Sequence, residues 1–279
     1  MNCLIVRIFW LWILIFARPS TAAMNSFIYI GCSQLKYAPG SPYESGVNSI
    51  LTSVVNAAAF SGYNTFKFPF PASSAVSGLY QCRGDLSGSI CHDCVSEAVS
   101  RLGSSCVGAA GGAMQLEGCF VRYDNATFVG VEDKTVVTDK CGPPIDGGDE
   151  SGVLTGKDGV LAYLMAGGQY FRVGGSGKVQ GLAQCVQDLS ISECQDCISE
   201  AIQRLKNECG SSAWGDMFLG KCYARYSERG YTAKHDENDD EMEKTLAIFI
   251  GLVAGVAVLI VFLSVLSKLL DRKGGSSGK

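Results

Sequence analysis

The spacing of apolar residues predicts helices and short strands along the chain. Between residues 45 and 60, and again between 91 and 102, apolar side chains recur every three or four positions, which is typical of amphipathic helices. Residues 27–30 and 63–70 are short apolar or aromatic stretches typical of strands, and residues 113–123 have the pattern strand, turn, strand. Together these segments predict an α+β fold with two helices packed on a small antiparallel sheet.

The cysteines indicate that this unit occurs twice. Five of them follow the spacing C-x8-C-x2-C-x11-C-x12-C, which recurs 103 positions later without insertion. The first set is Cys82, Cys91, Cys94, Cys106 and Cys119, and the second is Cys185, Cys194, Cys197, Cys209 and Cys222. A sixth cysteine opens each copy, Cys32 and then Cys141. We therefore expect two modules of one design, the second with a helix near 158–165 and a strand, turn and strand at 216–226.

Apolar runs near both ends predict a secretory signal peptide and a membrane span. Residues 1–23 have a basic residue, a short apolar run and a small-residue cleavage site, although an uncleaved anchor is the alternative. Residues 245–267 are uncharged over a length that spans a bilayer. An acidic stalk at 235–244 precedes the span, and a basic tail at 268–279 follows it. Because positive residues prefer the cytoplasmic side, we expect type I topology.

The predicted order places module 1 at 24–136 and module 2 at 137–234, both outside the cell. Oxidising space favours disulfides, and six cysteines per module fit three bridges each. The Cys91/Cys94 and Cys194/Cys197 pairs also invite a zinc or a thioredoxin-type interpretation. We favour structural disulfides, because the zinc interpretation leaves the other cysteines unexplained. Sequence alone leaves fifteen pairings open in each module.

Composition argues against catalysis, cofactors and nucleic-acid binding. The chain has two histidines, and Gln195 stands in copy two where copy one has His92, which excludes a duplicated histidine-dependent site. Glycine-rich stretches at 108–112 and 174–177 lack the residues of a phosphate loop, so we expect turns there. Glu97 is expected to be a solvated helix charge. The net charge of −4 says little by itself, but nothing in the sequence resembles a basic nucleic-acid surface.

Two further motifs concern modification and assembly. Asn125 begins the sequon Asn-Ala-Thr and is a candidate glycosylation site in an extracellular module. Within the predicted span, Ala247, Gly251 and Gly255 are four residues apart, a small-residue stripe that favours helix self-association. The alternative is that glycine is simply common in membrane helices.

The cysteine spacing, with an Arg-Tyr pair after the last cysteine, resembles the ginkbilobin-type stress-antifungal domain of plants. Two such domains with a signal, one span and a very short tail resemble the plasmodesmata-located proteins. The cysteine-rich receptor-like kinases share the double ectodomain, but we expect no kinase domain here. The resemblance implies the pairs Cys32–Cys106, Cys82–Cys91, Cys94–Cys119, Cys141–Cys209, Cys185–Cys194 and Cys197–Cys222.

The resemblance also implies a sugar site and a cellular role. The antifungal relative binds mannose through an Asn, an Arg and a Glu. The matching positions are Ser33, Ala113 and Asp124 in copy one and Gly142, Asp216 and Ser227 in copy two. Only Asp124 keeps the chemical type, which makes it a weak ligand candidate, and a cell-wall glycan becomes a doubtful partner.

The family resemblance implies a non-catalytic protein of the plasma membrane at plasmodesmata. Such proteins promote callose deposition, restrict cell-to-cell traffic and dock viral movement proteins. Expected partners are therefore the membrane, the callose synthase machinery, viral movement proteins and a second copy of the chain. The alternatives are a membrane-tethered carbohydrate-binding or antifungal lectin and a kinase-free co-receptor for receptor kinases.

Overall fold

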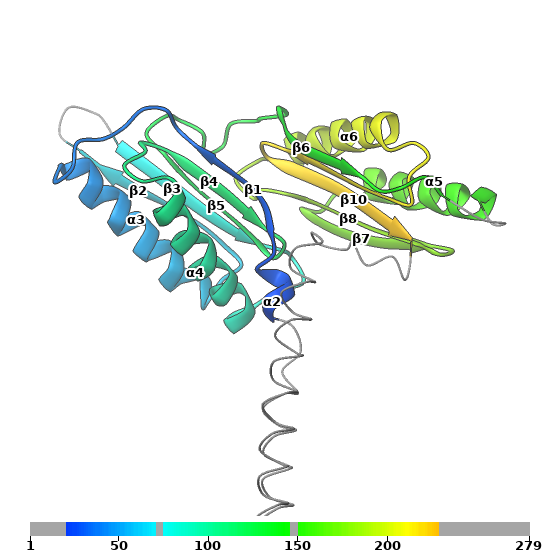
Figure 1. The fold of residues 1–279 in the computed structure, drawn as a ribbon, viewed down its shortest axis with the longest axis horizontal. Coiled ribbons are helices and arrows are strands. Elements are labelled where there is room, and N and C mark those ends of the chain that lie inside the picture. Colours follow the sequence, from blue (N-terminus) through cyan, green and yellow to red (C-terminus); the bar gives the residue numbers. More distant parts are fainter. Residues whose placement is uncertain (1–20, 71–74, 146–149, 229–279) are drawn as a thin grey trace, which may run out of the picture. The chain divides into compact units, whose positions relative to one another are not determined.

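The computed structural model describes residues 21–70, 75–145 and 150–228 (Figure 1). The predicted stalk, span, tail and small-residue stripe lie outside these ranges, as does most of the predicted signal peptide. Within the described ranges, no helix is long and apolar enough to cross a membrane. Met24, the first residue after the predicted cleavage site, accepts a hydrogen bond from the Gly118 amide at 2.8 Å.

The first module is a five-stranded antiparallel sheet with two long helices, in the order β1-β4-β5-β3-β2. Its elements are α2 (Thr21–Met24), β1 (Phe27–Cys32), α3 (Pro42–Ala58), β2 (Tyr63–Pro69), β3 (Ala75–Cys82), α4 (Gly88–Ser105), β4 (Gly112–Leu116) and β5 (Cys119–Asp124). Figure 1 shows α3 and α4 side by side along one face of this sheet.

The second module repeats this topology with the strand order β6-β9-β10-β8-β7. Its elements are β6 (Val136–Cys141), α5 (Glu150–Ala166), β7 (Phe171–Ser176), β8 (Val179–Cys185), α6 (Ile191–Glu208), β9 (Trp214–Leu219) and β10 (Cys222–Glu228). The tandem α+β architecture predicted from the repeat is therefore confirmed.

The helical periodicity becomes the core of each module. Val47, Ile50 and Val54 lie on one stripe of α3 and are buried against the sheet. The helix packs closely on the sheet because residue 78 is a glycine. A Cβ on Gly78 would lie 2.2 Å from Ile50 Cγ2. Module 2 uses the same device, since a Cβ on Gly181 would lie 2.6 Å from Val160 of α5. Glycine at these two strand positions lets the first helix of each module approach the sheet.

Six disulfides join these elements, and they are the six pairs that the resemblance implied. They are Cys32–Cys106, Cys82–Cys91, Cys94–Cys119, Cys141–Cys209, Cys185–Cys194 and Cys197–Cys222. Each module thus has one bridge from its first strand to the C-terminal end of its second long helix. The other two bridges hold the N-terminal part of that helix to the central strands.

Three features differ from the sequence expectation. The predictions did not include β3 and its counterpart β8, whose alternation is weak because side chains on both faces are buried. Helix α5 begins earlier than the predicted helix at 158–165. The turn predictions were wrong for Gly112, which begins strand β4, and for Gly174 and Gly175, which belong to strand β7. Glycine fits this strand because a Cβ on Gly174 would lie 2.5 Å from the Tyr163 ring.

Candidate functional site at the junction of the modules

The sheet faces that point away from the helices carry the residues joining the two modules. In module 1, strand register places Tyr29, Phe120 and Gln81 on this outer face. In module 2, Phe218 and Gln184 hold comparable places on theirs. The rings of Tyr29 and Phe218 meet edge to face, with centroids 6.2 Å apart. This geometry is favourable for aromatic pairs, so the outer faces form a shared apolar contact.

Two buried glutamines exchange hydrogen bonds with backbone groups across the junction. Gln184 Oε1 accepts from the Gly84 amide at 3.0 Å, and Gln184 Nε2 donates to the Cys82 carbonyl at 3.0 Å. Gln81 Oε1 accepts from the Gln187 amide at 2.8 Å. Gln81 and Gln184 are only 3% and 4% exposed. Because buried amides require hydrogen-bond partners, separating the modules would leave these groups without them, and the bonds hold the two modules together.

A cluster of arginines and carboxylates closes one side of the junction. Arg225 of module 2 donates to Asp216 of its own module at 2.7 and 2.9 Å and to Glu117 of module 1 at 2.7 Å. Glu117 also accepts from Arg83 at 3.1 Å. Burial opposes the charge on Arg225, but the carboxylates of Asp216 and Glu117 outweigh it and raise the pKa of Arg225. The guanidinium therefore stays charged within the contact.

A buried ion pair anchors the segment between the modules. Lys221 Nζ donates to Asp188 Oδ2, and both side chains are almost fully buried. Asp188 Oδ2 also accepts from the Gly130 amide at 2.9 Å, and Lys221 Nζ lies 5.4 Å from the centre of the Phe128 ring. Burial lowers the pKa of Lys221, opposing the effect of its Asp188 partner. The segment at 128–130 is thereby held against module 2.

Two hollows adjoin the junction and differ greatly in size. A cavity of about 20 Å³ between the glutamines and Tyr223 has room for about one water molecule. An open groove of about 480 Å³ on module 1 is lined by polar and apolar residues in equal number, and the polar ones include Thr65, Lys67, Ser77 and Asn125. Only the groove has a size typical of ligand sites.

The structure brings the three candidate sugar-site positions of copy one close together at the end of β1, β4 and β5. Ser33 donates from its amide to the Gly111 carbonyl at 2.8 Å, and Asp124 lies against Gly111. Asp124 Oδ1 accepts from the Ala126 amide at 3.1 Å, and its other oxygen is 3.9 Å from Arg122. In copy two, the Asp216 carboxylate accepts a hydrogen bond from Arg225. Neither copy has an arginine at the matching position.

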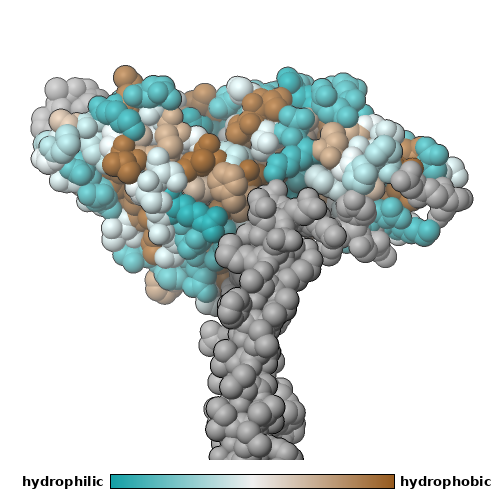
Figure 2. Space-filling model, in the orientation of Figure 1, coloured by the Kyte–Doolittle hydropathy of each residue, from teal (hydrophilic) through white to brown (hydrophobic). Residues whose placement is uncertain are grey.

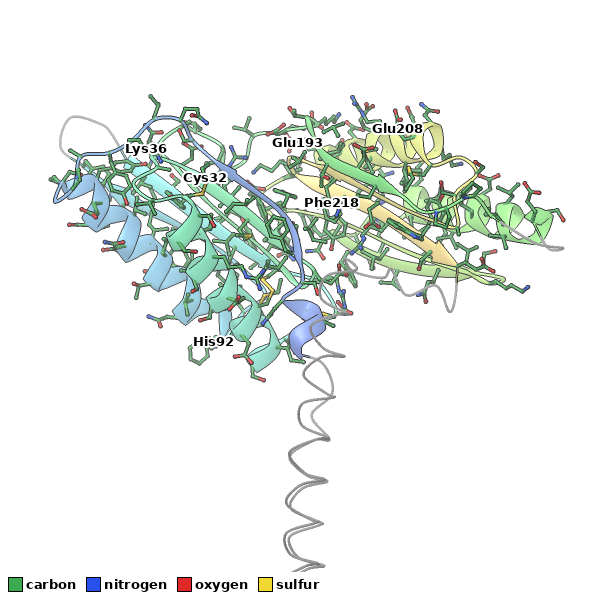
Figure 3. The ribbon with its side chains drawn as sticks, in the orientation of Figure 1. Cys32, Lys36, His92, Glu193, Glu208 and Phe218 are labelled. Carbon is green, nitrogen blue, oxygen red and sulfur yellow. A yellow bond between two sulfur atoms is a disulfide. The ribbon has the colours of Figure 1, made fainter. Side chains whose placement is uncertain are left out.

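The other sequence candidates lie apart from the junction. His92 is on α4 and points away from the sheet (Figure 3), 3.4 Å from Asp93. Glu97, expected to be a solvated helix charge, is partly exposed and forms an i,i+4 ion pair with Arg101, with 2.6 Å between Oε1 and Nε. Across the described ranges, no group of three or more His, Cys, Asp or Glu side chains is arranged to hold a metal. The cysteines of both C-x2-C pairs are in disulfides to other partners.

The junction residues carry no motif by which the sequence would mark them as functional. One signal was present, because Gln81 and Gln184 occupy matching positions of the repeat. A second was the pair of mismatches at Glu117, which matches Gly220, and at Lys221, which matches Gly118. Neither signal indicates by itself that the two modules contact each other.

Two disulfide-bonded α+β modules of one topology, packed through their outer sheet faces, define a tandem cysteine-rich protein. The sequence pattern of the Salt stress response/antifungal family matches residues 31–126 and 159–229, and the chain belongs to this family. Plasmodesmata-located protein 6 of Arabidopsis thaliana is 58% identical over 271 residues, covering 92% of this chain and 93% of that protein.

Two solved structures have the same tandem fold. The tandem DUF26 ectodomain of the Arabidopsis thaliana cysteine-rich receptor-like protein PDLP5 matches with a TM-score of 0.69 and 45% identity. The corresponding ectodomain of PDLP8 matches with a TM-score of 0.70 and 40% identity. Each match covers 74% of this chain and 100% of the solved chain.

Proposed function

We propose that the chain is a non-catalytic, single-pass type I membrane protein of plasmodesmata that modulates cell-to-cell traffic. The observation that carries this proposal is the 58% identity to a plasmodesmata-located protein over 92% of the chain, which reaches beyond the two modules. The ectodomain would lie in the apoplast, and the predicted span would place the chain in the plasma membrane. Its effect would act through callose deposition and through docking of partners such as viral movement proteins.

The surface chemistry of the modules supports a binding role rather than catalysis. On the face drawn in Figure 2, hydrophobic residues form several separate patches between hydrophilic ones. Leu35 and Val107 are 66% and 70% exposed at one end of module 1. The backbone bond from the Tyr37 amide to the Gly108 carbonyl, at 3.0 Å, brings their two loops together. Exposed apolar side chains on a disulfide-fixed loop pair suit contact with another protein.

A fluorescent fusion of the full-length chain in leaf epidermis tests the proposal. We expect puncta that coincide with callose-stained wall sites, and slower spread of a diffusible fluorescent protein between cells. A matched fusion that lacks residues 24–234 but keeps the signal and the span separates targeting from ectodomain activity. An even distribution along the plasma membrane, or unchanged spread at high expression, contradicts the proposal.

A second candidate function is a membrane-tethered carbohydrate binder. The observation that favours it is the open groove of about 480 Å³ on module 1, which presents Thr65, Ser77 and the Lys67 ammonium. Binding of the purified full-length protein to wall glycans on an array, lost in Lys67→Ala with Ser77→Ala, supports this candidate. No retention of any glycan excludes it and leaves the first proposal unaffected.

A further inference from the structure

The contact between the modules is built twice from matching residues of the repeat. Gln81 binds the Gln187 amide, and Gln184 binds the Gly84 amide. Adding 103 to 81 and to 84 gives 184 and 187, so the two bonds exchange when the modules are exchanged. A patch that pairs reciprocally with its own copy is the signature of an isologous, two-fold contact. Each module therefore carries one copy of a single module-binding patch.

The same exchange applies to the arginines, but one carboxylate is missing. Arg225 of module 2 binds Glu117 of module 1 at 2.7 Å. The exchanged pair would be Arg122 of module 1 with a carboxylate at position 220, where the chain has Gly220. A strictly reciprocal patch would thus leave Arg122 without its partner on this side of the contact.

Asp133, from the segment between the modules, occupies the missing place. A Cβ on Gly220 would lie 2.4 Å from Cγ of Asp133, so the aspartate fills the space that a larger residue at position 220 would need. Arg122 Nη1 is 3.9 Å from Asp133 Oδ2. The Thr135 amide fixes the aspartate by donating to Asp133 Oδ1 at 3.1 Å. The Gly220 amide donates to the Thr135 carbonyl at 2.9 Å, which holds this segment beside Gly220.

We propose that Asp133 takes the place of the carboxylate that is absent at Gly220. This replacement makes the two patches unequal, so that the patch of module 2 is specific for module 1 and not for a second copy of module 2. The side with Glu117 and Arg225 is short and well shielded, with side chains 18% and 16% exposed. The side with Asp133 and Arg122 is longer and more exposed, at 36% and 22%. The patch on module 2 accordingly fits a partner of the module 1 type, which presents a glutamine at the place of Gln81 and a carboxylate at the place of Glu117.

The unequal sides have a structural consequence. Coulomb attraction falls with distance and with exposure to water, so the Arg122 side holds the modules less firmly than the Arg225 side. A second copy of module 2 would offer Arg225 only Asp133, which lies beside Gly220 and forms the longer and more exposed kind of pair. Its guanidinium would lose the shorter and better shielded contact with Glu117. Pairing of two second modules is disfavoured for this reason.

Exchange of the carboxylate between the two positions tests the proposal in the full-length protein in detergent micelles. Gly220→Glu alone puts a second carboxylate against Asp133, and we expect the contact to open more often. The amides of Gly84 and Gln187, which donate across the contact, should then exchange with deuterium roughly tenfold faster. Gly220→Glu with Asp133→Ala regenerates the reciprocal Arg–Glu pair and should restore slow exchange.

Two controls separate the charge effect from general damage. Gly220→Gln with Asp133→Ala has the same bulk without the charge, so exchange at Gly84 and Gln187 should stay fast. The Arg83 and Val186 amides bond within their own modules and report any loss of module structure. The proposal is overturned if the Glu and Gln double variants exchange alike, or if Gly220→Glu leaves exchange at wild-type rates. If Gly220→Glu alone fails to fold, recovery by Asp133→Ala in the Glu but not the Gln background supports it, and absence of that difference overturns it.

Discussion

Removal of the Lys221 ammonium is predicted to destabilise the second module strongly. Lys221 and Asp188 form an ion pair whose side chains are 1% and 2% exposed. In Lys221→Met, the Asp188 carboxylate keeps only the Gly130 amide, because its Oδ1 atom already lacks a partner among the described residues. Breaking a buried pair costs about 3–5 kcal/mol. This is a large part of the ~5–15 kcal/mol that holds a domain folded.

Two controls identify burial as the cause of this loss. Lys134→Met breaks the pair with Glu132, whose side chains are 35% and 34% exposed, and should cost less than ~1 kcal/mol. Lys221→Met with Asp188→Leu removes both charges and leaves only the Gly130 amide unpaired, which costs about 1–3 kcal/mol. The double variant should therefore be more stable than Lys221→Met alone.

Urea unfolding of the full-length protein in detergent micelles, followed by the fluorescence of Trp214 in β9, measures these free energies. A cost for Lys221→Met no greater than that for Lys134→Met would show that burial is not the cause. A double variant that costs the sum of Lys221→Met and Asp188→Leu would also contradict the prediction, because a coupled buried pair cannot be additive.

Three further predictions concern the modules separately. Burial raises the pKa of Tyr226 to about 12. The protein should therefore lose stability as pH rises from about 10 toward 12, and Tyr226→Phe should flatten this fall in thermal unfolding. Replacing Cys32 and Cys106 by serine removes a disulfide between residues 74 positions apart and should lower the free energy of unfolding by about 4.5 kcal/mol. The same change at the short Cys82–Cys91 loop should lower it by about 2.7 kcal/mol. Equal losses of stability in urea unfolding would contradict the loop-entropy explanation. Asn125→Gln in plant-expressed protein should remove one N-glycan by intact mass, and an unchanged mass shows that the sequon is unused.

The module fold followed from the sequence because its signals are local. Apolar residues at helical spacing in 45–60 and 91–102 became α3 and α4. The boundaries of these helices, Pro42–Ala58 and Gly88–Ser105, differ from the predicted ranges by a few residues at each end. The strand, turn and strand at 113–123 became β4 and β5. Strand β3 was not predicted, since Leu79 on its outer face is buried in the cluster with Val186 of module 2. Its apolar and polar residues do not alternate, because the outer face is buried by residues that lie far away in the sequence.

The candidate site was less predictable than the fold. Asp124 and Asn125 could be named from a resemblance and a sequon, and the structure places them beside Arg122 and in the open groove. Gln81 and Gln184 were visible only as matched letters of a repeat. Their role depends on bonds between residues separated by more than 100 positions. Such pairs leave no periodic trace in the chain.

By itself, the sequence determined the duplication and the cysteine framework, because fixed spacings between bridged residues tolerate no insertion. Only the tertiary structure decided that the two frameworks pack through their outer faces, with Arg225 on Glu117 and Asp133 in the space beside Gly220. The physical reason is that the strength of these interactions depends on how far each group is shielded from water, and residue type alone does not determine that shielding. A glutamate in water is a solvated charge, whereas Glu117, shielded between two arginines, fixes how one module recognises the next.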